Sequence, residues 1–237
     1  MKIEKRNVIS FLIFIMIMML IISCKTKTNV DNSSKKDTDS LKTNPLTEAK
    51  LLFIKTDSVK KLNKTFKLDD KFRTVLSELE KQHPLHFFEK SAIYFKICKY
   101  DESAFLYHLG VLRYNYFNLT NKDYQASGDG ALFESLKYET GENVSIYLKN
   151  YIDKFIEILK LVDEYVKTND YSFHSKTINL KQYNELEYSK LINNLQKNKA
   201  KFIDEWTNER NKMLDTINKG IEEYNKLTDE EKKKLKE

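Results

Sequence analysis

The sequence has little proline, glycine or cysteine, and each shortage narrows the possible folds. Its 237 residues include two prolines, five glycines and two cysteines. Few prolines and glycines leave few points at which secondary structure must break, so the composition favours helix throughout. Two cysteines allow no disulfide framework of the kind that stabilises small secreted domains. We therefore expect one all-α domain that folds around an apolar core.

Sequence motifs of the common catalytic and cofactor sites are also absent. The chain has no nucleophile elbow, phosphate-binding glycine loop, dinucleotide fingerprint, paired-carboxylate motif or HExxH zinc motif. The net charge of +6 is spread along the chain without a basic stripe, which argues against nucleic-acid binding. We expect no cofactor and no metal. An enzyme is disfavoured, although catalytic residues scattered through the sequence stay an open alternative.

The first 24 residues have the order of an export signal. Lys2, Lys5 and Arg6 precede an apolar run from Phe11 to Ile22, and a small residue and a cysteine follow it. The run of about a dozen residues is shorter than the roughly 20 that a helix needs to cross the hydrocarbon core. It therefore indicates a cleaved signal rather than a permanent span.

The end of this signal, Ile21, Ile22, Ser23 and Cys24, resembles the lipobox of bacterial lipoproteins. The resemblance implies that signal peptidase cuts before Cys24 and that a diacylglyceryl group is joined to it. Ile22 departs from the small residue that is commoner at its position. The alternative is an uncleaved anchor helix. Lipid chains on Cys24 would hold the protein on a membrane of the cell envelope, outside the cytoplasm, without crossing that membrane.

The residues beyond this cysteine refine the prediction. Lys25 follows it, and not the Asp that resembles an inner-membrane retention signal, which favours the outer membrane. Removing residues 1–23 takes away three basic and one acidic side chain and leaves a net charge of +4. Lipidation of Cys24 leaves no second cysteine for an internal disulfide. The apolar-rich context FKICKY predicts that Cys98 is a buried small hydrophobe.

Composition divides the chain into four parts. Residues 25–45 are polar, charged and almost free of large apolar side chains, so they cannot bury enough surface to fold. We expect a disordered tether that holds the domain about 25 Å from the lipid on average. The predicted parts are a signal peptide at 1–23, a lipidated tether at 24–45, an all-α domain at 46–226 and a charged tail at 227–237.

Apolar spacing predicts two helical features in the first half of the all-α domain. An amphipathic helix over 69–82 begins at the capping residues Asp69 and Asp70. A helical hairpin follows Pro84, with a polar break at 99–102 between its two helices.

The second half is also predicted to be helical. A loop at 118–130 precedes a short helix that Gly141 ends. The wide apolar face of 144–166 predicts a central helix that packs on more than one side. A loop at 168–181 then leads to a long amphipathic pattern over 183–224.

The hairpin resembles one tetratricopeptide repeat. Its bulky, small and aromatic residues follow the order that this repeat prefers. The matching residues are Phe87, Ser91, Tyr94, Tyr100, Ser103, Tyr107 and Gly110. Lys90 and Asn115 depart from the pattern, and one repeat is fewer than the roughly three that an independent solenoid needs. The predicted fold is therefore an all-α helical bundle or array with one TPR-like hairpin.

A longer stretch resembles an uncharacterised family of bacterial exported proteins. It runs from DESAFLYHLGVLRYNYF through GDGALFESLKYETGENVSIYL to a loop ending near YSF. The positions that carry the resemblance are Ala104, Phe105, Gly110, Arg113, Tyr114, Ala131, Leu132, Phe133, Ser135, Leu136 and Gly141. The resemblance implies a helical fold and adds no catalytic residue.

Arg113 is the most interesting single residue, because arginine is rare in the chain. It lies on a tyrosine-rich helix with Tyr107 and Tyr114, and the loop that carries Asp129 and Phe133 follows. Arg113 could clamp an anion or a carboxylate. The alternative is that it pairs with an internal acidic residue and holds the loop to the hairpin. These five residues are the candidate binding residues.

Other candidates for chemistry are weaker. His83, His86, His108 and His174 show no metal-ligand spacing, and His108 is expected to be packed. The loop NKDYQASGDGALFE is rich in oxygen ligands, but its acidic residues do not alternate as in a calcium loop. A calcium site there is a minor alternative.

Two hypotheses of function follow. The first is a membrane-anchored binding module whose hairpin and Gly128 to Phe133 loop form an aromatic-lined groove for a protein or peptide. Its specific form is an immunity-type lipoprotein that neutralises a toxin in the envelope. The second is an envelope enzyme or small-molecule binder that uses the region of Arg113. The expected partners are the membrane, through Cys24, and a protein or peptide, with no nucleic acid.

Overall fold

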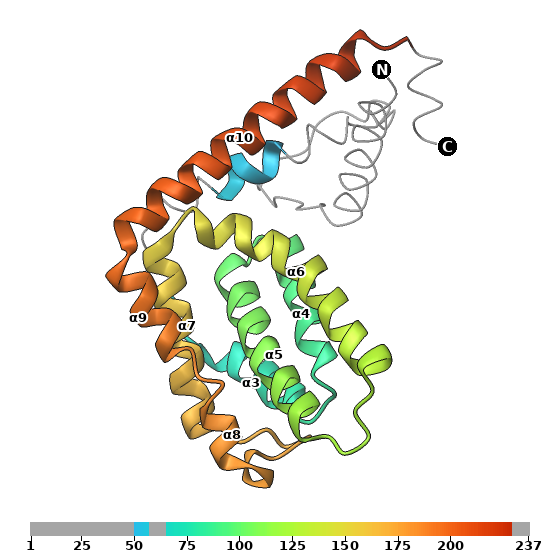
Figure 1. Ribbon diagram of the computed structural model, residues 1–237, viewed down its shortest axis with the longest axis vertical. Coiled ribbons are helices and arrows are strands. Elements are labelled where there is room, and N and C mark those ends of the chain that lie inside the picture. Colours follow the sequence, from blue (N-terminus) through green and yellow to red (C-terminus); the bar gives the residue numbers. More distant parts are fainter. Residues whose placement is uncertain (1–49, 57–64, 229–237) are drawn as a thin grey trace, which may run out of the picture. The chain divides into compact units, whose positions relative to one another are not determined.

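The protein is all-α, as the sequence predicts. The computed structural model describes residues 50–56 and 65–228, and no strand occurs among them (Figure 1). Residues 50–56 are helical. The other elements are α3 (Asp70–Leu79), α4 (Leu85–Lys96), α5 (Tyr100–Thr120), the π-helical turn η2 (Ala126–Gly130), α6 (Ala131–Lys149), α7 (Ile152–Thr168), the 3-10 turn η3 (Lys176–Ile178), α8 (Leu180–Asn184), α9 (Ser189–Lys197) and α10 (Lys199–Lys226).

Several predictions for the ends of the chain fall outside these residues. They are the signal peptide at 1–23, the lipidation of Cys24, the tether at 24–45 and all but the first two residues of the tail at 227–237. Within the described part, no helix has the length and apolar character needed to cross a membrane.

The chain divides into two compact units where the sequence predicts one domain over 46–226. One unit comprises residues 59–207, and the other comprises residues 1–58 together with 208–237. In the second unit, the guanidinium of Arg210 lies 4.5 Å from the ring centroid of Phe53 and donates a hydrogen bond of 3.0 Å to the carbonyl of that residue. The candidate binding residues all lie in the unit of residues 59–207.

Helix α3 forms where a cap and an amphipathic pattern coincide. The Asp69 side chain accepts a hydrogen bond of 2.8 Å from the backbone N–H of Phe72, which satisfies one of the free donors at the helix start. Phe72, Leu76 and Leu79 are buried along one face. The predicted helix at 69–82 is confirmed, but it ends earlier, at Leu79.

Helices α4 and α5 form the predicted hairpin, held by small residues at their contact. The Ser91 hydroxyl donates to the Ser103 carbonyl at 2.7 Å, and the Ser103 hydroxyl donates to the Ser91 carbonyl at 2.8 Å. The break is shorter than predicted. Asp101 and Glu102 belong to the first turn of α5, where their negative charge faces the positive end of the helix dipole.

The prediction that Cys98 is buried is wrong. Cys98 is exposed and has a φ of 62°, in the left-handed region, because it lies in the turn between α4 and α5. Local apolar composition did not reveal that the chain reverses direction at this residue. Cys98 is also disulfide-bonded, whereas the sequence predicted no internal disulfide.

Helix α5 is the central helix of its unit. It contacts α4, α6 and α7, and it is buried on nearly all sides. The sequence predicted a central helix at 144–166, but that segment belongs to two helices, α6 and α7, which are separated at Asn150 and Tyr151. Tyr151 has a φ of −144° and a ψ of 74°, outside the helical region, although neither proline nor glycine marks the break.

The glycine that was expected to end a helix serves packing instead. Helix α6 continues through Gly141 to Lys149. A Cβ atom on Gly141 would lie 2.4 Å from the hydroxyl oxygen of Tyr107 on α5. The absent side chain therefore lets the tyrosine lie against α6, where its hydroxyl donates to the Lys137 carbonyl at 3.3 Å.

Two further boundaries differ from the predictions. The loop at 118–130 is shorter, because α5 continues to Thr120 and residues 126–130 form the π-helical turn η2. The pattern over 183–224 is divided among α8, α9 and α10.

An apolar cluster joins α7, α9 and the start of α10. It consists of Ile152, Phe155, Ile156, Leu159, Tyr188, Ile192, Leu195, Phe202 and Trp206.

Replacing Gly110 with Ala should destabilise the hairpin. The added Cβ would lie 2.8 Å from the Cβ of Phe87, so α4 and α5 would have to separate. We expect a loss of about 1–3 kcal/mol in the free energy of unfolding, even though Ala is the better helix former. Urea unfolding of the full chain in detergent, followed by circular dichroism, measures this loss. Gly128→Ala is the control, since its nearest contact would be 3.7 Å away. Equal stability of the two variants would contradict the packing assigned to Gly110.

Candidate functional site

The five candidate binding residues do not form one site. Tyr107, Arg113 and Tyr114 lie on α5, Asp129 lies in η2 and Phe133 lies in the first turn of α6. Consecutive residues on an α-helix point about 100° apart, so Arg113 and Tyr114 leave α5 in different directions. Arg113 points toward the end of α3 and the loop after α7, whereas the other four lie around the start of α6.

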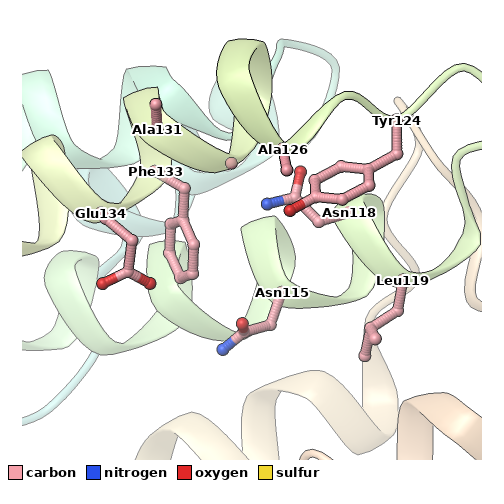
Figure 2. Close-up of a pocket in the computed structure, with 9 residues that line it drawn as sticks. Asn115, Asn118, Leu119, Tyr124, Ala126, Ala131, Phe133 and Glu134 are labelled. Atoms are coloured by element: carbon pink, nitrogen blue, oxygen red, sulfur yellow. The ribbon is translucent and has the colours of Figure 1, made fainter.

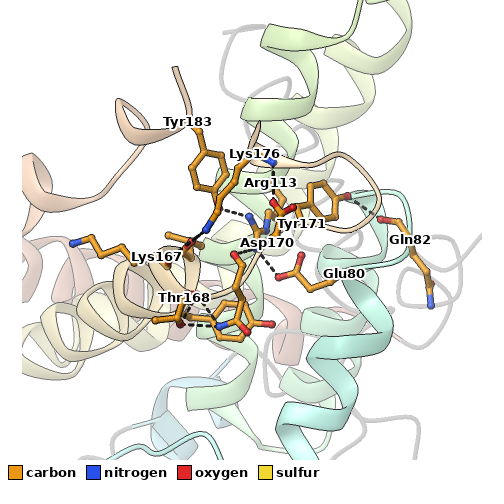
Figure 3. Close-up of polar contacts among 12 residues, drawn as sticks. Glu80, Gln82, Arg113, Lys167, Thr168, Asp170, Tyr171, Lys176 and Tyr183 are labelled. Carbon is orange, nitrogen blue, oxygen red and sulfur yellow. Dashed lines mark hydrogen bonds and ion pairs between the residues drawn. The ribbon is translucent and has the colours of Figure 1, made fainter. Parts of the chain in front are cut away.

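Arg113 lies inside the protein. Its side chain is 0% exposed. One terminal nitrogen, Nη2, donates to Glu80 Oε1 at 2.7 Å and to the Asn169 carbonyl at 3.4 Å, and Nη1 donates to the Tyr183 hydroxyl (Figure 3). The guanidinium carbon also lies 5.0 Å from the ring centroid of Tyr171. Arg113 thus joins residues from α3, α5, α8 and the loop between α7 and α8.

The electrostatics around Arg113 are those of an internal ion pair. Burial raises the pKa of Glu80, while the charge of Arg113 lowers it. Burial also raises the pKa of Tyr183 and Tyr171 beside the guanidinium. Ion pairs of this kind are costly to break, because removing one partner leaves the other charged and desolvated.

This geometry favours one of the two alternatives for Arg113. It pairs with an internal acidic residue, Glu80, and no solvent-exposed surface of the guanidinium is left to clamp an external anion. The prediction of which loop Arg113 holds was wrong, however. Arg113 holds the segment around Asn169 and Tyr171, not the loop that carries Asp129.

Three of the other candidates, Tyr107, Tyr114 and Phe133, belong to an aromatic cluster between α4, α5 and α6. The rings of Tyr114 and Phe133 stack with centroids 4.9 Å apart at an angle of 28°. Phe88 meets both rings edge-on, and Tyr107 meets Phe88. Tyr114 is fully buried and Phe133 is 4% exposed, so these rings contribute mainly to the core.

A cleft of about 420 Å³ lies beside this cluster, between the end of α5, the turn η2 and the start of α6. Figure 2 shows its lining side chains, which come from both helices and from the intervening loop. The lining residues are Asn115, Asn118, Leu119, Tyr124, Ala126, Gly130, Ala131, Phe133 and Glu134. Phe133 is the one candidate that lines this cleft, and it provides a wall of the cleft while packing on Tyr114.

Two polar atoms beside the cleft lack hydrogen-bond partners within the described residues. They are the Asn118 Oδ1 and the Tyr114 hydroxyl, four residues apart on α5 and thus on one face of the helix. Burial and the nearby charge of Asp129 raise the pKa of Tyr114 to about 12. Unpartnered buried polar groups are rare in folded proteins, and they mark this end of α5 as a place where a ligand would add missing hydrogen bonds.

Asp129 and the histidines give no sign of a metal centre. Asp129 Oδ1 lies 4.0 Å from His83 Nε2, and burial lowers the pKa of His83. His108 is packed, as expected: its ring stacks on Phe155 at 5.3 Å, and burial lowers its pKa to about 3. Over residues 50–56 and 65–228, no three His, Cys, Asp or Glu side chains are grouped closely enough to hold a metal ion.

The sequence analysis missed several residues of these two places. Glu80 and Tyr183 lie 33 and 70 residues from Arg113, and nothing local pairs them with it. Asn118 had a signal that could have been used, because it follows Tyr114 by one helical turn and is the first residue of the predicted loop at 118–130. Tyr124 lies within that loop and Glu134 follows Phe133, but neither was singled out.

Comparisons of the chain with protein families, with curated proteins and with solved structures found no match. The resemblances to a tetratricopeptide repeat and to exported bacterial proteins therefore depend on the residues that carry them. The geometry of the two places described above is the basis for any statement about function.

Replacing Arg113 with Ala should destabilise the fold strongly. Glu80 would keep its buried position without its cation, and we expect a loss of about 3–5 kcal/mol in the free energy of unfolding. Urea unfolding of the full chain in detergent measures the change. Arg73→Ala is the matched control, because Arg73 is exposed and donates only to the Leu68 carbonyl. An Arg113→Ala variant as stable as this control would show that the ion pair is not structural.

Proposed function

We propose that this chain is a cell-envelope lipoprotein whose helical body binds a protein or peptide in the cleft beside Phe133. The cleft is the observation that carries the proposal. Its volume of about 420 Å³ lies within the range of roughly 300–1,000 Å³ that is usual for ligand sites. Its lining combines apolar side chains with polar groups that could orient a ligand. An immunity-type lipoprotein is a specific form of this proposal, and a toxin gene adjacent to its own would support it.

The alternative function, an enzyme or small-molecule binder that uses Arg113, has less support. It needs a guanidinium that a ligand can reach, and Arg113 is enclosed by Glu80, Tyr171 and Tyr183. A ligand at that place would have to displace an internal ion pair. The cleft needs no such rearrangement of the core.

Anchoring outside the cytoplasm is the second part of the proposal, and the order of the first 24 residues supports it. Charged residues, an apolar run and the lipobox-like Ile21 to Cys24 follow one another as in exported lipoproteins. Lys25 favours the outer membrane. The tether at 25–45 would place the cleft away from the lipid surface, within reach of a soluble or membrane-bound partner.

Lipidation of Cys24 makes a prediction that mass spectrometry can check. The chain has two cysteines, so a thioether on Cys24 and an intramolecular disulfide at Cys98 cannot coexist in one molecule. We expect protein isolated from bacterial membranes to begin at Cys24 and to carry diacylglycerol there. The Cys24→Ala variant should keep residues 1–23 and carry no lipid. Recovery of unlipidated Cys24 in a disulfide with Cys98 would reject the anchor.

Site-specific photo-crosslinking tests the binding module. A benzoylphenylalanine placed at Leu119, which lines the cleft, should crosslink a discrete partner in the intact envelope. The same group at Lys197, exposed on α9, should not, because that position lies outside the cleft. Cys24→Ala should reduce crosslinking, because the unlipidated protein keeps residues 1–23 and is not delivered to the outer membrane. Identical products from Leu119 and Lys197, or none from either, would contradict the proposed cleft function.

A further inference from the structure

One acidic side chain lines the cleft. Among its lining residues, Glu134 is the one whose side chain carries charge, and that side chain is exposed. Its partner Lys137, 2.8 Å away, is one turn further along α6 and does not line the cleft. The ammonium of Lys137 lies over the Phe133 ring, 4.9 Å from its centroid. Lys137 therefore already pairs with Glu134 beside the cleft, and a cation of a ligand would share or take over that carboxylate.

The inner end of the cleft holds one unsatisfied acceptor and one hydroxyl without a partner. The Asn118 Oδ1 is a buried acceptor that no donor among the described residues satisfies. The Tyr114 hydroxyl, one turn earlier on α5, is also without a partner, and Asp129 near it adds negative charge. A ligand group with several N–H donors and a positive charge would donate a hydrogen bond to Asn118 Oδ1. The negative charge of Asp129 would also attract it.

The remaining lining is apolar or neutral and is suited to an alkyl stem. Leu119, Ala126, Ala131 and the ring of Phe133 line the cleft together with the polar groups. Long basic side chains bury their methylenes on such surfaces while the charged end reaches polar partners. A small inorganic cation would leave this apolar surface uncovered.

We propose, building on the proposed function, that the cleft takes the basic side chain of an arginine or lysine in an extended segment of the partner protein. The methylene stem lies along Phe133 and Leu119. The charged end pairs with the carboxylate of Glu134 and donates a hydrogen bond to Asn118 Oδ1. The unpaired oxygen of the unbound protein thereby gains its missing hydrogen bond.

Tyr124 lines the cleft beside Asn118 (Figure 2). Solvent does not reach Asn118 Oδ1 in the unbound protein. The Tyr124 ring is 42% exposed, and its hydroxyl lies over Gly130 with no hydrogen-bond partner among the described residues. In this proposal the ring turns outward from Gly130 and admits the ligand.

A peptide titration on the full-length chain in nonionic detergent tests the inference. The probes are acetyl-Ala-Ala-X-Ala-Ala-amide peptides, in which X is arginine, lysine, norleucine or glutamate. Binding is followed by NMR through the side-chain amide signals of ¹⁵N-labelled asparagine, assigned for Asn118 with the Asn118→Leu variant. We expect the arginine and lysine peptides to shift the Asn118 signal and to bind about fivefold more tightly than the norleucine peptide.

Variants separate the contributions. Glu134→Gln should weaken binding of the arginine peptide about fivefold and leave the norleucine peptide unchanged. Tyr124→Ala should strengthen binding of the arginine peptide, because the cleft is already open. Glu139→Gln, an exposed change on the same helix outside the cleft, is the matched control. Circular dichroism confirms that each variant is folded.

Three results would overturn the inference without touching the proposed function. The first is equal binding of the arginine and glutamate peptides, and the second is a partner crosslinked from Leu119 whose yield is unchanged in Glu134→Gln. The third is the absence of any shift at Asn118 with the basic peptides. Loss of the position-specific crosslink at Leu119 would instead reject the cleft as the binding site, and the inference with it.

Discussion

The buried ion pair between Arg113 and Glu80 is the interaction on which this end of the fold depends. Withdrawing two charges from water is unfavourable, so the pair is tolerated only because its geometry is good and tyrosine rings and hydroxyls surround it. Once formed, it fixes the end of α3 against α5. It also positions the loop after α7, whose Tyr171 hydroxyl donates to the Gln82 carbonyl and whose Phe173 N–H donates to the Glu80 carbonyl, both at 2.8 Å.

Helix α5 presents the ion pair and the cleft in different directions, although the residues involved are neighbours in the sequence. Arg113 faces the ion pair, whereas Tyr114 and Asn118 face the start of α6 and the cleft. A single helix buried on nearly all sides can do this, because neighbouring residues point about 100° apart. The rarity of arginine therefore did not point to an exposed site, because Arg113 is buried in the ion pair with Glu80.

Local signals predicted those parts of the fold that local interactions determine. The Asp69 cap, the helix start after Pro84 and the apolar spacing of α4 and α5 could be read from neighbouring residues. Gly141 and the break at Tyr151 could not, because each depends on a packing partner or a backbone conformation that no residue type announces. The same limit applied to the candidate site: Phe133 was found with its loop, but the pairing of Glu80 with Arg113 spans 33 residues.

The reciprocal hydrogen bonds of Ser91 and Ser103 have a consequence for how this hairpin can change over evolution. Both hydroxyls bond carbonyls that belong to helical backbone, so a hydroxyl can be lost without leaving a carbonyl unsatisfied. Volume is the stricter limit, since both residues are 0% exposed at the contact of two helices. Divergent forms of the chain can thus exchange serine for alanine one position at a time. Larger residues would need compensating losses across the interface.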